Sequence, residues 1–167
     1  MILAIYTVVH VIISLVGIVS GFVVVVGMLG AKRLDCWTSL FLATTVATSV
    51  TGFGFPVHHL LPSHVVGIIS LVVLAVAIFA LYARHLAGAW RGTYVITAVI
   101  ALYLNVFVLV VQAFLKVPAL KEMAPTQTEP PFKLAQLVVL ALFVVLGIIA
   151  TIRFRDEPGR DTEISAK

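Results

Sequence analysis

The sequence predicts an all-α integral membrane protein, built as a bundle of five transmembrane helices. Of its 167 residues, 62% are hydrophobic and only 11% are charged, and the mean hydropathy is +1.18. A soluble domain of this size needs more polar surface than this composition supplies. The apolar residues also gather in runs of about twenty, the length that crosses ~30 Å of hydrocarbon as a helix. Because lipid offers no hydrogen-bond partner to an open backbone, each run is expected to be helical.

The five expected spans cover residues 2–29, 37–57, 63–83, 93–115 and 132–152. The first is longer than a bilayer is thick, so it should tilt or protrude. It has no basic residue before its apolar run and no cleavage motif, which favours a retained helix over a cleaved signal peptide. The bundle then comprises residues 1–153, and residues 154–167 form a charged cytoplasmic tail that is expected to be disordered.

Basic residues are divided unevenly between the two ends of these expected helices. One end, formed by the first and third connections and the tail, carries Lys32, Arg33, Arg84, Arg91, Arg153, Arg155, Arg160 and Lys167. The other end carries only Lys116, Lys121 and Lys133, partly balanced by Glu122 and Glu129. The positive-inside rule therefore predicts that the N-terminus lies outside and the C-terminus lies in the cytoplasm. The net charge of +4 comes from these connections and the tail, so it reflects membrane topology and does not indicate a surface that binds nucleic acid. No nucleic-acid partner is therefore expected.

The connection between the fourth and fifth spans is the longest. It contains Pro118, Pro125, Pro130 and Pro131, which predict a stiff, non-helical segment. On the predicted orientation it lies outside, where it can fold over the outer mouth of the bundle.

A short repeat links the first and third spans. "HVIISLV" begins at His10, and "HVVGIISLV" begins at His64. Each is followed by basic residues and then by a tryptophan, at a similar separation. The pattern predicts that the first four helices form two related hairpins, with the fifth helix added.

The histidines are the candidate site. His10, His58, His59 and His64 are all expected near the outer level, from three different helices. In one interpretation, His10 and His64 bind haem b as paired axial ligands, or these four histidines bind a transition metal. In the other, the histidines of the second connection are ordinary interfacial residues and His10 stabilises packing through a hydrogen bond to a neighbouring helix.

Other polar residues of the spans are expected to serve helix packing. Thr44, Thr48 and Thr51 share a helix face, which suits either a narrow pore or contact with a neighbour. Gly17-x-x-x-Gly21 is a close-packing motif. In the fourth span, Asn105 is expected to bond a threonine of the second, and Gln112 lies on the same face, toward the outside, where it would alternatively orient a quinone or a haem edge.

The segments "LFLATTVATSVTGFGFP" and "ALYLNVFVLVVQAFLKVPAL" resemble a family of small polytopic inner-membrane proteins of alphaproteobacteria whose activity is uncharacterised. The resemblance extends over most of the chain. It implies location in the bacterial inner membrane, so that the outward face and the N-terminus are periplasmic. It implies no activity and no functional residues.

The leading functional hypothesis rests on the charged residues and the catalytic motifs that the sequence lacks. No Asp, Glu or Arg lies inside the expected spans, and the one Lys, Lys133, stands at the outer end of the fifth. This disfavours proton-coupled transport, and no phosphate-binding loop, nucleophile elbow or zinc-protease motif occurs. We therefore expect a non-catalytic packing or accessory subunit, in contact with the bilayer and with a second copy or a larger membrane complex. The alternatives are a redox or ligand-binding protein with haem b, a metal or a quinone, and a passive pore.

Overall fold

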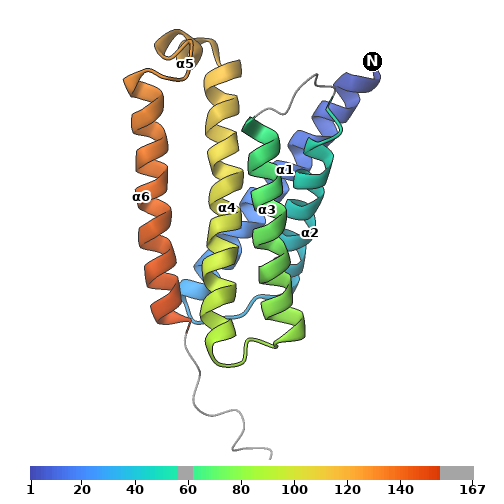
Figure 1. Cartoon of the computed structure of the whole chain (residues 1–167), viewed down its shortest axis with the longest axis vertical. Helices are drawn as coiled ribbons and strands as arrows, with labels where there is room; N and C mark the ends of the chain where they lie inside the picture. The colour runs from blue at the N-terminus through green and yellow to red at the C-terminus, as the bar shows by residue number, and fades with distance from the viewer. Residues whose placement is uncertain (56–61, 155–167) are drawn as a thin grey trace, which may run out of the picture.

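The computed structural model describes residues 1–55 and 62–154, and every regular element within them is helical. In chain order the elements are α1 (Ile2–Leu29), α2 (Asp35–Gly52), α3 (Pro62–Ile78), the π-helix η1 (Phe79–Ala83), α4 (Ala89–Lys116), α5 (Pro118–Met123) and α6 (Pro130–Arg153). The all-α helical bundle is confirmed (Figure 1). The tail beyond residue 154, which is expected to be disordered, lies outside the described residues.

Four helical stretches are long and apolar enough to cross a membrane: Ile2–Leu29, His64–Ala83, Ala89–Lys116 and Pro130–Arg153. The protein is thus a helical membrane protein with four candidate spans. The remaining expected span, at residues 37–57, corresponds to α2. This helix is 18 residues long and includes seven Ser and Thr residues and Asp35. These polar side chains lower its hydropathy below that of the other helices, although α2 stands beside α3 in the bundle (Figure 1).

The bounds of the first helix were predicted correctly, and the bounds of the other helices differ from the expected ones by a few residues. The largest shift is at the end of α2, which stops at Gly52 instead of residue 57. There the hydroxyl of Tyr6, from α1, donates a hydrogen bond to the carbonyl oxygen of Thr51. The same carbonyl also accepts from the Gly54 amide at 3.0 Å, so Tyr6 is its second donor. A contact from another helix is therefore made at the turn where α2 ends.

The connection between α4 and α6 is not the non-helical segment that its prolines predicted. It contains α5, a helix of six residues with Pro118 in its first turn. Proline is well suited to this position because its fixed φ is helical and its missing N–H would have had no partner. Pro130 begins α6 in the same way. The prolines thus start helices here, and the connection bridges the ends of α4 and α6 (Figure 1).

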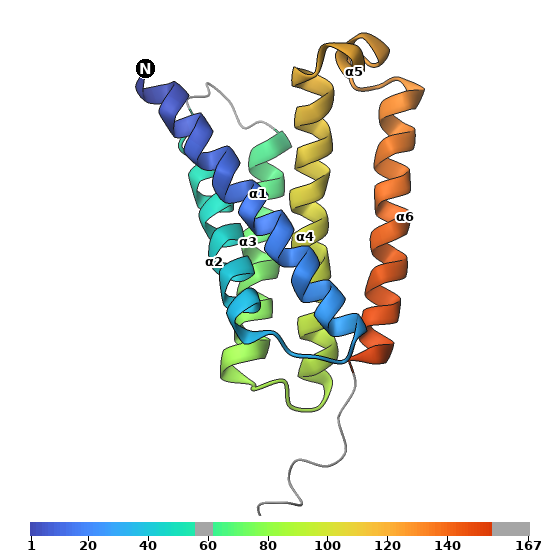
Figure 2. The same ribbon diagram turned by 180° about the vertical axis from the view of Figure 1, so that it is seen from behind.

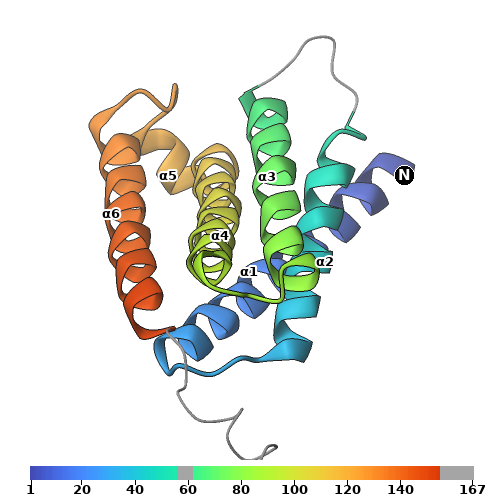
Figure 3. The ribbon, with the colours of Figure 1, turned by 60° about the horizontal axis from the view of Figure 1, so that its bottom comes forward.

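The long first helix is inclined to the rest of the bundle. Seen from behind, α1 runs diagonally from the α2 side to the foot of α6 (Figure 2). Along this path it packs on α2, α4 and α6. The view from below shows α4 near the middle, between α3 and α6, with α1 passing under it (Figure 3). The first helix is therefore inclined to its neighbours, and its tilt in the membrane remains a prediction.

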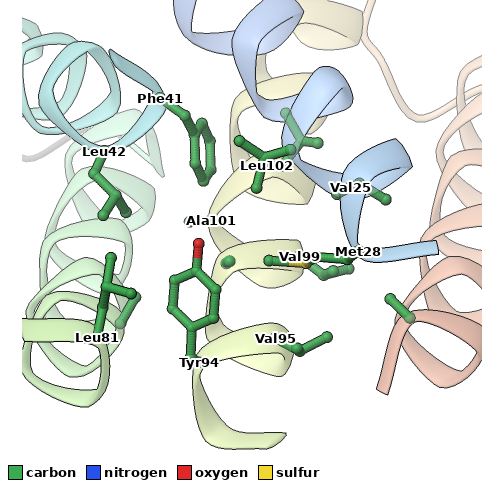
Figure 4. Packing of buried hydrophobic residues seen from close by; sticks show 14 of the residues in the cluster. Val25, Met28, Phe41, Leu42, Leu81, Tyr94, Val95, Val99, Ala101 and Leu102 are labelled. Carbon is green, nitrogen blue, oxygen red and sulfur yellow. The ribbon is translucent and has the colours of Figure 1, made fainter. Parts of the chain in front are cut away.

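The hydrophobic core lies where α1, α2, η1 and α4 meet, in the half of the bundle near the C-terminus of α1. Figure 4 shows its side chains converging from these elements: Val25, Met28, Phe41, Leu42, Leu81, Tyr94, Val95, Val99, Ala101 and Leu102. All are at most 4% exposed. Tyr94 is the polar member, and its hydroxyl donates to Thr38 Oγ1 at 3.5 Å. The core holds together the half of the bundle that includes the C-terminus of α1, whereas the contacts at the other end are largely polar and aromatic.

Candidate functional site

His10 lies in the third turn of α1 and faces the C-terminal turn of α2. Its Nδ1 is 2.8 Å from Thr51 Oγ1. Thr51 Oγ1 is also 2.6 Å from the carbonyl oxygen of Ala47. The Thr51 hydroxyl has one proton, so it donates either to that carbonyl or to His10 Nδ1. When it donates to the carbonyl, Nδ1 is the donor, and a neutral ring then has on Nε2 the lone pair that could bind a metal.

Two aromatic side chains complete this site. The Phe55 ring makes edge-to-face contacts with Tyr6 and His10, each with ring centroids 5.1 Å apart. We call Tyr6, His10, Thr51 and Phe55 the His10 cluster. Gly54 makes room for it, because a Cβ there would be only 2.1 Å from the Tyr6 hydroxyl oxygen. A residue with any side chain at this position would displace Tyr6 from the end of α2.

His64 is near the start of α3 and is only 7% exposed. Its ring packs against Phe53, with centroids 5.5 Å apart. The two histidines therefore approach the same short segment after α2, but at different residues of it. A haem site that uses both remains a prediction, and neither of two open grooves on the described surface is lined by a histidine.

The expected histidine cluster is not found in the described part of the chain. Among residues 1–55 and 62–154, no group of three or more His, Cys, Asp or Glu side chains is close enough to hold a metal ion. Of the four proposed ligands, only His10 and His64 are described, and they lie against different neighbours, Thr51 and Phe53. His58 and His59, the other two proposed metal ligands, lie outside the described residues.

A row of polar contacts continues from the His10 cluster toward the middle of the bundle. Asn105 Nδ2 donates to Thr45 Oγ1 at 3.3 Å, which confirms the expected bond between the fourth span and a threonine of the second. Thr44 donates back to the carbonyl of its own helix, as Thr51 does. A Cβ on Gly17 would be 3.2 Å from Thr44 Oγ1, so α1 approaches α2 closely along this face. The threonine face thus packs against α1, as expected for the packing interpretation.

Thr48, on the same face, is an exception. Its Oγ1 is buried and has no hydrogen-bond partner among the described residues. Buried hydroxyls are nearly always bonded, so Thr48 departs from the pattern of the other threonines on this face. Gln112 is half-buried on α4, and its suggested role toward a quinone remains a prediction.

The connection before α6 is organised by one carboxylate. Glu129 Oε1 accepts hydrogen bonds from the Thr126 amide at 3.2 Å and the Thr126 hydroxyl at 2.8 Å, and Oε2 accepts from the Thr128 amide at 3.0 Å. Desolvation alone would raise the pKa of Glu129, but these bonds stabilise the charged form more and hold the pKa below its usual value. Gln127 Nε2 donates to the carbonyl of Val111 at 3.0 Å. The connection is therefore fastened to the end of α4.

A groove separates α4 from α6 on the side facing away from the core. The two helices run antiparallel in a register given by three contacts: Gly92 beside Thr151, Val99 beside Gly147, and Tyr103 against Phe143. The groove has a volume of about 430 Å³ and extends from Leu140 to Ile152 on α6. Its lining is apolar except for Tyr103 and Thr151.

In comparisons with known proteins, no family model matches this chain, and no curated protein or solved structure matches it significantly. The family resemblance drawn from the sequence therefore remains a prediction.

The sequence interpretation missed Tyr6 and the groove. Tyr6 stands four residues before His10 and so shares its helix face, a signal that could have placed it in the same site. The groove depends on how far apart α4 and α6 pack, and α6 is apolar on all sides. Nothing in the pattern of its residues marks the face that borders the groove.

Proposed function

We propose that α2 is a fifth span and that the protein resides in the bacterial inner membrane with its N-terminus in the periplasm. Two observations support this. The helix packs between α1 and α3, so it shares their depth in the membrane. In addition, Lys32, Arg33, Arg84, Arg91 and Arg153 stand at the end of the bundle where α1 and α6 finish. That end is the cytoplasmic one by the positive-inside rule.

Within that membrane, the proposed role is that of a non-catalytic accessory subunit of a larger assembly or of a homo-oligomer. One observation carries this role: only 11% of the most apolar window of α6 is buried within the bundle, compared with 44% for α1. The polar side chains inside the bundle are meanwhile engaged with one another, as in His10–Thr51, Asn105–Thr45 and Ser49–Ser70. The molecule thus offers a scaffold with one largely uncovered helix, and α6 is the surface we assign to a partner.

The structure changes where the partner should bind. The sequence interpretation placed association at the small-residue faces. Gly17 and Gly21 are instead buried against α2 and α4, so they hold this chain together. Association through α6 replaces association through those glycines.

The test is purification in a mild detergent with measurement of the mass of the protein in the complex. We expect an oligomer or a co-purifying membrane protein, and we expect Leu142→Trp to weaken it, because Leu142 is 51% exposed on α6 and does not line the groove. A matched control is Val72→Trp on α3, where Val72 is 60% exposed. A stable monomer without a protein partner would refute the accessory role.

A second candidate function is ligand binding at the His10 cluster, with haem b, a transition metal or a quinone. The observation in its favour is the hydrogen bond between His10 Nδ1 and Thr51, because a neutral ring that donates through Nδ1 has a lone pair on Nε2 for a ligand. The test is an absorption spectrum of oxidised and dithionite-reduced protein, with metal analysis of the same sample. A chromophore or metal that His10→Ala removes supports this function. A colourless, metal-free protein from cells supplied with haem and metals would contradict haem and metal binding.

A further inference from the structure

The groove between α4 and α6 has the length of one membrane leaflet. Leu140 and Ile152 mark its two ends on α6, and the helix rises about 1.5 Å per residue, which gives roughly 18 Å between them. One leaflet of hydrocarbon is about 15 Å deep. The floor is made by Val99, Phe143 and Gly147, where the absent side chain of glycine deepens the groove. In a bilayer, a trough of this length and polarity is filled by an acyl chain.

The end of the groove near the C-terminus of α6 is cationic. Arg91 lies with its guanidinium carbon 5.9 Å from the centroid of the Phe154 ring, and it precedes Gly92, which is beside Thr151 in the groove. Arg153 follows Ile152 directly, and its Nη1 is 3.5 Å from the carbonyl of Leu29. Two guanidinium groups therefore stand at the level where the headgroup of a phospholipid in the groove would lie. Arginine is the side chain best suited to bind phosphate.

We propose that this groove binds one acyl chain of an anionic phospholipid, with the headgroup phosphate beside Arg91 and Arg153. The lipid occupies the leaflet on the side where α6 ends. It joins α6 to α4 where the protein itself leaves space, and it makes the attachment of α6 depend on the lipid composition. This inference needs only that the helices span a membrane, and it holds whether or not α6 also binds a protein.

The test is a titration of the full-length protein in detergent with dioleoyl-phosphatidylglycerol or dioleoyl-phosphatidylcholine, read by native mass spectrometry. Two variants separate the parts of the site. Arg91→Gln with Arg153→Gln removes the cations. Val144→Phe fills the groove, and Val145→Phe is its matched control, because both valines are 52% exposed but only Val144 lines the groove.

We expect wild-type protein and Val145→Phe to bind phosphatidylglycerol more tightly than phosphatidylcholine. The double arginine variant should lose affinity for phosphatidylglycerol by about fivefold per arginine, with little change for phosphatidylcholine. Val144→Phe should weaken binding of both lipids. Circular dichroism confirms that each variant keeps its helices. Equal affinity of the wild type for the two lipids, or equal binding by the two valine variants, would overturn the proposal. So would a groove occupied by a second copy, seen as a dimer that Val144→Phe dissociates without changing lipid binding.

Discussion

Gly21 is the point where α1 comes closest to two other helices, and Gly21→Ala tests that contact. A Cβ at this position would be 2.6 Å from Leu102 Cδ1 and 2.9 Å from two ring carbons of Phe41. Both neighbours are fully enclosed, with 0% and 1% of their surface exposed. Carbon atoms in contact prefer about 3.5–4.0 Å, so the methyl group forces the core to move. Overpacking of this kind costs about 1–3 kcal/mol.

A control variant isolates this steric cost. Replacing glycine by alanine inside a helix also stabilises the helix, by up to about 1 kcal/mol. Gly147→Ala has the same benefit without the collision, because a Cβ there would be 3.5 Å from Val99 Cγ1, an ordinary contact. The difference between the two variants should therefore be about 1–3 kcal/mol, with Gly21→Ala the less stable.

The assay is unfolding in mixed micelles at increasing mole fraction of dodecyl sulfate, followed by circular dichroism. Each variant is compared with the wild type in the same detergent. If Gly21→Ala were as stable as Gly147→Ala, α1 would not approach α2 and α4 as closely as the structure shows, and the crossing of α1 would need revision.

Further predictions concern the polar contacts. Thr45→Val removes the acceptor of Asn105 and should destabilise the bundle by about 0.6–2 kcal/mol in the same unfolding assay, whereas an unchanged stability would show that Asn105 finds another partner. Ser70→Ala should cost less, because Ser49 keeps its bond to the Thr45 carbonyl at 2.9 Å when it loses the one to Ser70; a loss larger than that of Thr45→Val would contradict this order. For Glu129, the pKa in the folded protein is lowered, so its hydrogen bonds stabilise the connection above about pH 4.5 and this contribution is lost as the pH falls through the folded pKa. Glu129→Gln should make the two amides bound to this carboxylate exchange hydrogen faster at neutral pH, and exchange as slow as in the wild type would show that the carboxylate does not order the connection.

Some of the candidate site could be read from the sequence, and some could not. His10 was identified because a titratable ring is unusual inside an apolar helix. Its partner Thr51 lies 41 residues away in the chain, and no local pattern connects the two. The partner of Asn105 could be predicted, because a buried amide in a membrane needs a hydrogen bond and most of the threonines within the expected spans lie in the second span. The expectation was correct for that reason, although several threonines were equally suitable.

By itself, the sequence determined that this protein is helical and resides in a membrane, because composition and run length leave no other way to satisfy the backbone in lipid. It also determined the first helix, whose bounds coincide with its apolar run. Tertiary structure alone decided that α1 crosses the bundle on Gly17 and Gly21, that Tyr6 contacts the last turn of α2, and that a groove runs along the line where α4 and α6 pack. These features depend on which faces of nearly uniform apolar helices meet. In lipid, hydrophobicity favours no helix face over another, so the shapes of the faces and a few hydrogen bonds determine which faces pack together.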